Sequence, residues 1–97
     1  MKTIPIVAVL FLGALAATAW SKEDPAAGAQ LYATNCAACH GADRAGVPGA
    51  FPALIDVGKR LDSGQIKERI RKGGGLMPPF PQLSQQEVDD IASFLAQ

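Results

Sequence analysis

The feature that most constrains this chain is the pentapeptide Cys36-Ala37-Ala38-Cys39-His40. The chain contains two cysteines and one histidine, and all three fall within these five residues. The spacing Cys-x-x-Cys-His is the pattern of covalent haem attachment. One helical turn between the cysteines lets each sulfur reach a different vinyl group on one edge of a porphyrin. The same turn carries His40 over the ring face, where an imidazole nitrogen can bind iron.

Other interpretations of the two cysteines fit less well. A structural disulfide suits an exported protein but leaves His40 without a role. A thioredoxin-like redox pair requires a βαβ context, which the sequence does not indicate. A zinc site needs four ligands, and this cluster offers three with no further cysteine or histidine in the chain. Haem attachment therefore remains the favoured hypothesis.

Residues 1–19 are predicted to be a signal peptide rather than part of the fold. Lys2 supplies a positive start, an uncharged apolar run follows, and Ala17-Thr18-Ala19 forms a small-x-small cleavage pattern before Trp20. The apolar run is short for a full bilayer span, which needs about 20 residues. Retention of the leader as an anchor is the alternative. Both interpretations place the functional domain outside the cytoplasm, and the periplasm is the expected compartment.

The predicted mature domain, residues 20–97, is small for a core built of side chains alone. A buried, covalently linked haem would supply the missing stabilisation, so we expect the apo chain to fold poorly. The formal net charge of the whole chain is zero. No overall attraction to nucleic acid or to anionic membranes is therefore implied.

Three main helices and no convincing strand are expected in this domain. The first spans about 26–38 after an Asp24-Pro25 start, with Gly28 at a position of close approach to another helix. The second spans 61–72, is capped by Asp62 or Ser63 and ends at Gly73. The third follows the capping box Ser84-x-x-Glu87. A short helical turn over 52–55, ending by Gly58, is also expected.

Two loops rich in glycine and proline separate these helices. The first runs from 41 to 52, and its neighbours Phe51, Leu54, Ile55 and Val57 are expected to line a crevice or the core. The second, residues 73–81, contains Met77, the only methionine after Met1. Because the chain has no second histidine, the Met77 thioether is the leading candidate for a sixth iron ligand opposite His40. A role as core filler is the alternative.

Charged residues suggest surface roles rather than catalysis. The segment 59–72 carries six basic and two acidic residues. A solvated helix face is the ordinary interpretation of this excess, and a docking patch for an acidic redox partner is the functional one. Glu87, Asp89 and Asp90 lie near the start of the last helix, where the helix dipole favours negative charge, and are expected to stabilise that helix.

Taken together, these motifs resemble the class I c-type cytochromes, in particular small bacterial mono-haem electron carriers. Gly28 and Tyr32 are similar to the glycine and aromatic residue of the family's first helix, which crosses the last one. The attachment motif, the Phe51-Pro52-Ala53-Leu54 segment, Leu76-Met77-Pro78 and the closing helix follow in the family's order. Phe51 stands where the family more often has glycine.

The resemblance implies an all-α fold of three main helices and loops wrapped around one covalently bound haem c. It also implies that the Pro52 carbonyl accepts a hydrogen bond from His40, which would orient that ligand. The expected cofactor-binding residues are Cys36, Cys39, His40, Met77 and Pro52, and His40 and Met77 are the expected iron ligands.

Such a site predicts one-electron transfer between redox protein partners such as a dehydrogenase, an oxidase or another cytochrome. It predicts no catalytic residue, because six-coordinate iron has no free position for a substrate. Two alternatives remain. The chain could be a haem-bearing subunit or membrane-anchored domain of a larger oxidoreductase complex, or, less in keeping with the motifs, a gas-binding or peroxidase-type protein with an open iron site.

Overall fold

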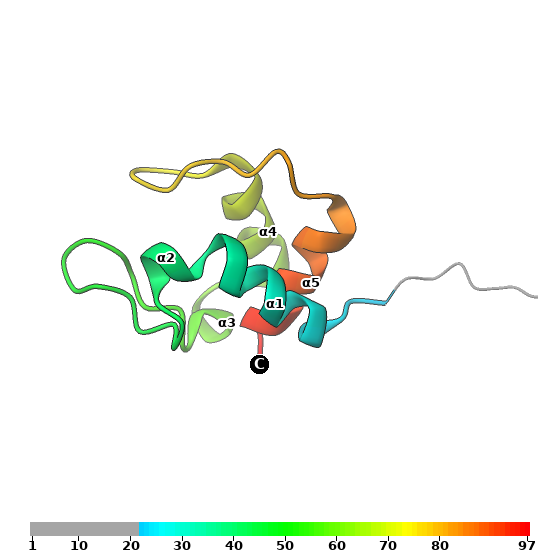
Figure 1. Cartoon of the computed structure of the whole chain (residues 1–97), viewed down its shortest axis with the longest axis horizontal. Coiled ribbons are helices and arrows are strands. Elements are labelled where there is room, and N and C mark those ends of the chain that lie inside the picture. The colour runs from blue at the N-terminus through cyan, green and yellow to red at the C-terminus, as the bar shows by residue number, and fades with distance from the viewer. Residues whose placement is uncertain (1–21) are drawn as a thin grey trace, which may run out of the picture.

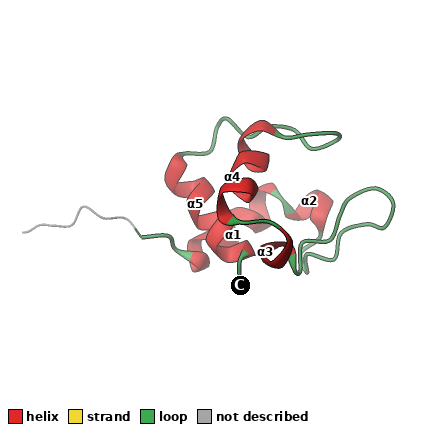
Figure 2. Ribbon diagram, turned by 180° about the vertical axis from the view of Figure 1, so that it is seen from behind, coloured by secondary structure: helices red, strands yellow, loops and turns green. Residues whose placement is uncertain are grey.

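The computed structural model describes residues 22–97, and this part of the chain is built from helices and loops (Figures 1 and 2). In order, its helices are α1 (Pro25–Asn35), α2 (Ala37–His40), α3 (Val57–Arg60), α4 (Ser63–Lys72) and α5 (Gln85–Leu95). Within these residues the extended pairings are two isolated bridges, Val47 with Phe51 and Gly74 with Met77. The predicted all-α class is confirmed, with α1, α4 and α5 as the three main helices.

Helix α1 begins at the predicted N-cap. The Asp24 carboxylate accepts hydrogen bonds from the backbone N–H groups of Ala26 (2.9 Å) and Ala27 (3.3 Å), and Pro25 occupies the first turn. The helix is shorter than the expected span of 26–38, because Cys36 leaves the helical region at φ −120°. The chain then forms the separate turn α2, which ends at His40.

Helices α4 and α5 both start with a capping box. In α4 the Asp62 side chain accepts from Gln65 N at 2.8 Å, and the Gln65 side chain accepts from Asp62 N at 2.9 Å. In α5 Ser84 and Glu87 make the same reciprocal pair. Each box satisfies backbone donors that no helical carbonyl can reach, so both starts were visible in the sequence.

The core forms where α1 crosses α5 and α4 packs beside them. At the crossing, Gly28 lies directly against the Asp90 backbone, and a Cβ atom there would overlap the Asp90 carbonyl oxygen. This close approach is the reason for a glycine inside α1. The buried apolar residues, drawn from α1, α3, α4 and α5, are Tyr32, Val57, Ile66, Ile70, Val88, Ile91, Ala92 and Leu95.

The expected short helix at 52–55 is wrong. These residues are not helical, and α3 starts later, at Val57, and includes Gly58 rather than ending there. Gly58 is used for packing, because a Cβ atom on it would lie 2.9 Å from Ala96 Cα. Ile55 was expected in a crevice or the core, but it is 54% exposed, whereas Val57 is buried.

The predicted signal peptide, residues 1–19, lies outside the described residues. Between residues 22 and 97, no helix combines the length and the apolar character that crossing a bilayer requires. Figure 1 shows the described chain entering beside α1 and α5, whereas the loops after α2 and α4 project from the other end of the molecule. The candidate site lies between these two loops.

Candidate functional site

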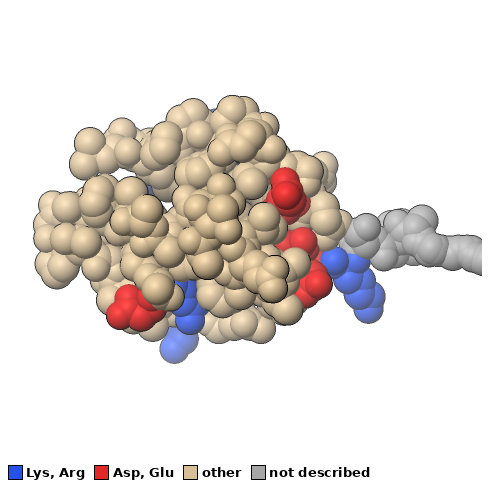
Figure 3. Space-filling view, in the orientation of Figure 1, with Lys and Arg blue, Asp and Glu red and all other residues tan. Residues whose placement is uncertain are grey.

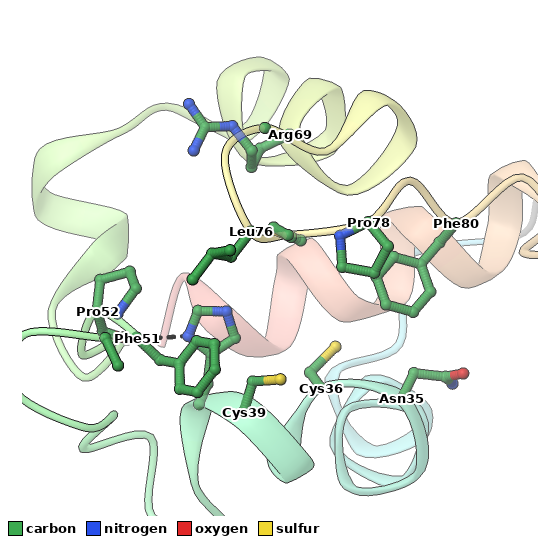
Figure 4. Close-up of a pocket in the computed structure, with 13 residues that line it drawn as sticks. Asn35, Cys36, Cys39, Phe51, Pro52, Arg69, Leu76, Pro78 and Phe80 are labelled. Atoms are coloured by element: carbon green, nitrogen blue, oxygen red, sulfur yellow. Dashed lines mark hydrogen bonds between the residues drawn. The ribbon is translucent and has the colours of Figure 1, made fainter.

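A cavity of about 260 Å³ lies between α2 and the loop that follows α4 (Figure 4). One wall carries Cys36, Cys39 and His40, and the other carries Leu76, Met77 and Phe80. The lining is mostly apolar, and the one charged side chain in it is Arg69 of α4. Residues from three distant parts of the chain therefore converge on one apolar space.

His40 is the last residue of α2 and is 8% exposed. Its Nδ1 atom lies 2.9 Å from the Pro52 carbonyl oxygen, the bond drawn as a dashed line in Figure 4. Because a carbonyl can only accept, Nδ1 carries the proton and donates. In the neutral imidazole this leaves the lone pair of the other ring nitrogen, Nε2, available to bind a metal.

Cys36 and Cys39 stand at the two ends of one helical turn, and both are free thiols. Figure 4 draws both sulfur atoms on the cavity side of this turn. Cys39 is exposed and Cys36 is half-buried. Burial, and then the neighbouring Cys39, raise the pKa of the Cys36 thiol to about 11. A disulfide is absent, and residues 22–97 hold no group of three His, Cys, Asp or Glu side chains arranged for a bare metal ion.

Met77 is held by a tight turn. Gly74 and Met77 exchange two backbone hydrogen bonds, each 2.9 Å long. Gly73 and Gly75 have φ values of 70° and 59°, which L side chains rarely adopt. A Cβ atom on Gly73 would also press on the Met77 and Pro78 backbone. The glycines before Met77 are thus required by the geometry that places it on the cavity wall.

A second cavity of about 130 Å³ shares part of the same wall and reaches toward the core. Both cavities are lined by His40, Pro52, Arg69 and Met77, and the smaller one ends on buried residues such as Ile66 and Ile70. Arg69 was not predicted as a site residue. Its position one turn before Gly73 places it beside the Met77 loop, but in the sequence it was one of six basic residues.

The chain matches known proteins over most of its length. A family model described as "Cytochrome C oxidase, cbb3-type, subunit III" matches residues 23–95. Cytochrome c-550 of Bacillus subtilis is 37% identical over 79 residues, which cover 81% of this chain and 63% of that protein. Cytochrome c-555 of Methylococcus capsulatus is 37% identical over 95 residues, covering 92% of this chain and 76% of that protein.

Two further similarities bear on fold and assembly. The solved structure of cytochrome c6 from the diatom Phaeodactylum tricornutum aligns with a TM-score of 0.63 at 31% identity, covering 75% of this chain and 91% of that one. The cbb3-type cytochrome c oxidase subunit CcoP of Rubrivivax gelatinosus is 40% identical over 82 residues, which are 75% of this chain and 26% of that subunit.

The chain therefore belongs to the class I c-type cytochromes, and its fold is the one that this family shares. The cofactor of the family is haem c, an iron porphyrin that is attached covalently to the protein. The cavity fits such a group, because its walls are apolar and its donors are soft sulfur and imidazole nitrogen, the types that iron porphyrins bind. Arg69 places a cation on this otherwise apolar wall. A cation there can pair with the carboxylate substituents of a haem, which would be costly to bury without a partner.

Proposed function

We propose that this chain is a periplasmic one-electron carrier. In this proposal Cys36 and Cys39 would hold haem c through two thioethers, and His40 and Met77 would bind its iron. One observation carries the proposal: a single apolar cavity gathers two thiols, one imidazole and one thioether from segments far apart in the sequence. When bound, the haem iron supplies a one-electron Fe(III)/Fe(II) couple.

The residues around the cavity tune this couple without taking part in bond chemistry. The Pro52 carbonyl fixes the His40 ring and makes it a stronger donor through the 2.9 Å hydrogen bond. The Met77 thioether favours the reduced ion, and the apolar wall opposes extra charge. If His40 and Met77 both bound the iron, no ligand position would remain for a substrate, and we propose that the chain is not an enzyme.

We further propose that Arg69 pairs with a carboxylate substituent of the haem. Its side chain packs beside Gly74, where a Cβ atom would lie 3.5 Å from Nε. The ion pairs of residues 22–97 leave this guanidinium without a carboxylate partner. A cation on an apolar wall is best satisfied by an anionic group of the occupant.

The proposed partners are redox proteins that bind transiently, and nucleic acid is not among them. The segments 25–42, 45–55 and 73–86 contain no Lys, Arg, Asp or Glu, and all three border the cavity. Figure 3 shows one side of the molecule, on which most of the visible charged side chains lie toward the right and along the lower edge. We therefore expect the cavity mouth to meet partners over a small, weakly charged interface.

A permanent place in an oxidoreductase complex is the second candidate. It is favoured by the family description and by the CcoP similarity, since each of these names a subunit of an oxidase. Because the chain spans 26% of CcoP and 63% of cytochrome c-550, both roles are proposals for this chain. The two candidates differ in whether the protein exists free in the periplasm or stays bound to the other subunits of a complex.

Fractionation followed by redox-titrated spectra tests the proposal. The full chain is expressed in a host that attaches haem, and periplasmic, membrane and partner-bound fractions are separated under mild conditions. A carrier is expected in the periplasmic fraction as a free, red protein that titrates as a single one-electron couple. Stable co-purification with a dehydrogenase or oxidase would instead support the subunit role.

A further inference from the structure

Arg44 has an unusual backbone conformation. It follows His40 by four residues in the loop 41–54, and its φ of 64° is the one positive value at a non-glycine residue between 22 and 97. This left-handed region disfavours a long side chain, and residues persist there when surrounding contacts over-determine them. Contacts with other parts of the structure therefore hold Arg44 in this conformation.

The side chain of Arg44 is held by an aromatic ring of α5. Its guanidinium carbon lies 5.0 Å from the centroid of the Phe94 ring, within the range of a cation–π contact. Phe94 in turn packs against Tyr32 of α1, with 5.5 Å between the ring centroids. The Nη1 atom of Arg44 is buried and has no hydrogen-bond partner within the described residues. The face of the Phe94 ring is thus the main favourable contact of the buried end of the Arg44 guanidinium.

The backbone of Arg44 closes the loop 41–54 onto the candidate ligand. Its carbonyl accepts a hydrogen bond from Leu54 N at 2.7 Å, two residues beyond Pro52. Gly46 N donates to the His40 carbonyl at 2.7 Å, and a Cβ atom on Gly46 would lie 2.7 Å from the Pro52 oxygen. The position of the Pro52 carbonyl is therefore fixed from residue 44 on one side and residue 46 on the other.

We propose that Arg44 is a positioning residue for His40. Stacking on Phe94 keeps residue 44 in its left-handed conformation, and this holds the Pro52 carbonyl on the His40 Nδ1–H. The donor strength of the imidazole is in this way coupled to α5. The inference rests on the proposed function, because it takes His40 as the iron ligand that the Pro52 bond tunes.

The test compares variants of the haem-loaded protein. Arg44→Lys keeps the charge but loses the planar group that stacks on the ring. Arg44→Gly removes both the charge and the stacking while tolerating the left-handed backbone. Arg71→Lys, at an exposed arginine of α4, is the matched control. Two quantities are measured: the solvent exchange rate of the His40 Nδ1 proton by NMR, and the reduction potential.

The expected result separates positioning from charge. Exchange of the His40 proton should accelerate at least tenfold in Arg44→Lys and stay unchanged in Arg71→Lys. The acceleration should be much smaller in Arg44→Gly, because glycine adopts the left-handed backbone without a contact to hold it. The reduction potential should rise in Arg44→Lys, which keeps the charge, because a weaker Pro52 bond makes His40 a poorer donor to the oxidised ion. Loss of a nearby cation alone acts in the opposite direction, since it lowers the potential.

Two results would overturn the proposal. One is unchanged proton exchange in Arg44→Lys, with only the melting temperature reduced, which is the signature of a purely structural contact. The other is a lower potential in Arg44→Gly together with an unchanged one in Arg44→Lys, which is the signature of charge alone. Failure of the proposed function is distinct from both, because the unmodified protein would then lack haem or a His40 signal shifted by iron.

Discussion

At the scale of single residues, the site depends on hydrogen bonds that fix side chains and backbone around His40. Pro52 orients the imidazole, and the Tyr32 hydroxyl donates to the Gly41 carbonyl at 2.6 Å. Tyr32 is 2% exposed, and burial raises its pKa. These contacts act on His40 and on Gly41 beside it, so small substitutions there should have measurable effects on stability and, if His40 binds iron as proposed, on ligation.

Tyr32→Phe should lower the free energy of unfolding by about 1–2 kcal/mol, because it removes a buried hydrogen bond and leaves the aromatic packing in place. Chemical denaturation of the haem-loaded protein measures this. Thr34→Val serves as the control, since its hydroxyl bonds to the Gln30 carbonyl at an exposed position and should matter far less. Equal losses in the two variants would show that the Tyr32 bond has no special role.

Met77→Ala should open one axial position. We expect loss of the sulfur-to-iron charge-transfer band, rapid binding of carbon monoxide and a reduction potential lower by on the order of 0.1 V, since axial ligands set haem potentials over a range of about 0.8 V. Ile55→Ala is the control, because Ile55 is 54% exposed and does not line the cavity. Unaltered spectra in Met77→Ala would exclude Met77 as a ligand.

At the scale of helices and loops, local sequence signals located the main helices but not the contacts between them. The caps at Asp24, Asp62 and Ser84 depend on residues close in sequence, and they were predictable. The start of α3 at Val57 was not, because it depends on Gly58 packing against the distant Ala96. Prediction failed where the deciding contact was far away along the chain.

The acidic residues of α5 illustrate the same limit. They were expected to act through the helix dipole, and Glu87 does complete the cap. Asp90, however, is 6% exposed and accepts hydrogen bonds from Asp24 N and Gln86 Nε2, both 2.8 Å long. Asp89 pairs with Lys67 of α4 at 3.1 Å. The main role of Asp89 and Asp90 is to connect α5 to α4 and to the start of α1. No local sequence pattern indicates these contacts.

Gly28→Ala should destabilise the protein although alanine favours helices. The new methyl group would overlap the Asp90 carbonyl, and such overpacking costs about 1–3 kcal/mol or more. Gly64→Ala, in α4, is the matched control, because its Cβ would meet only Asp62 Oδ1 at 3.4 Å. That variant should gain up to about 1 kcal/mol from helix propensity. Thermal unfolding compares the two, and a stabilised Gly28→Ala would contradict the described crossing.

Lys67 should stabilise the domain in a pH-dependent way. Its hydrogen bond to Asp89 is the main cause that raises its pKa, so the contribution is complete below the unfolded value of about 10.4 and is lost as pH rises through the folded value. The difference in unfolding free energy between wild type and Lys67→Met should therefore be constant from about pH 6 to 9 and shrink above about pH 10.5. A difference that persists undiminished at higher pH would argue against the ion pair.

At the scale of the whole molecule, charges and the cavity mouth occupy different parts of the surface. The basic segment 59–72, considered above as a docking patch, is partly neutralised: Arg60, Lys67 and Lys72 are each in ion pairs with carboxylates. The cavity instead opens among uncharged segments. The sequence indicated the candidate ligand residues and the loops, but not this separation, which arises only when the loops are brought together.

Electron transfer to a redox partner should therefore depend weakly on salt. We expect the second-order rate constant to change by less than about threefold between 0.01 and 0.15 M ionic strength, whereas steered association through a basic patch would fall much more steeply. Stopped-flow measurements at several ionic strengths provide the test. A steep decrease, relieved by Lys59→Gln and Arg71→Gln, would instead identify segment 59–72 as the docking surface.

The central claim is that one haem is bound covalently at Cys36 and Cys39. Its most direct test is the mass of the denatured protein, made in a host that attaches haem, beside a Cys36→Ala and Cys39→Ala double variant. We predict a red protein with the mass of the processed chain plus one haem, since addition of a thiol to a vinyl group loses no atoms, and a haem-free double variant. A colourless protein with the mass of the polypeptide alone would contradict the account.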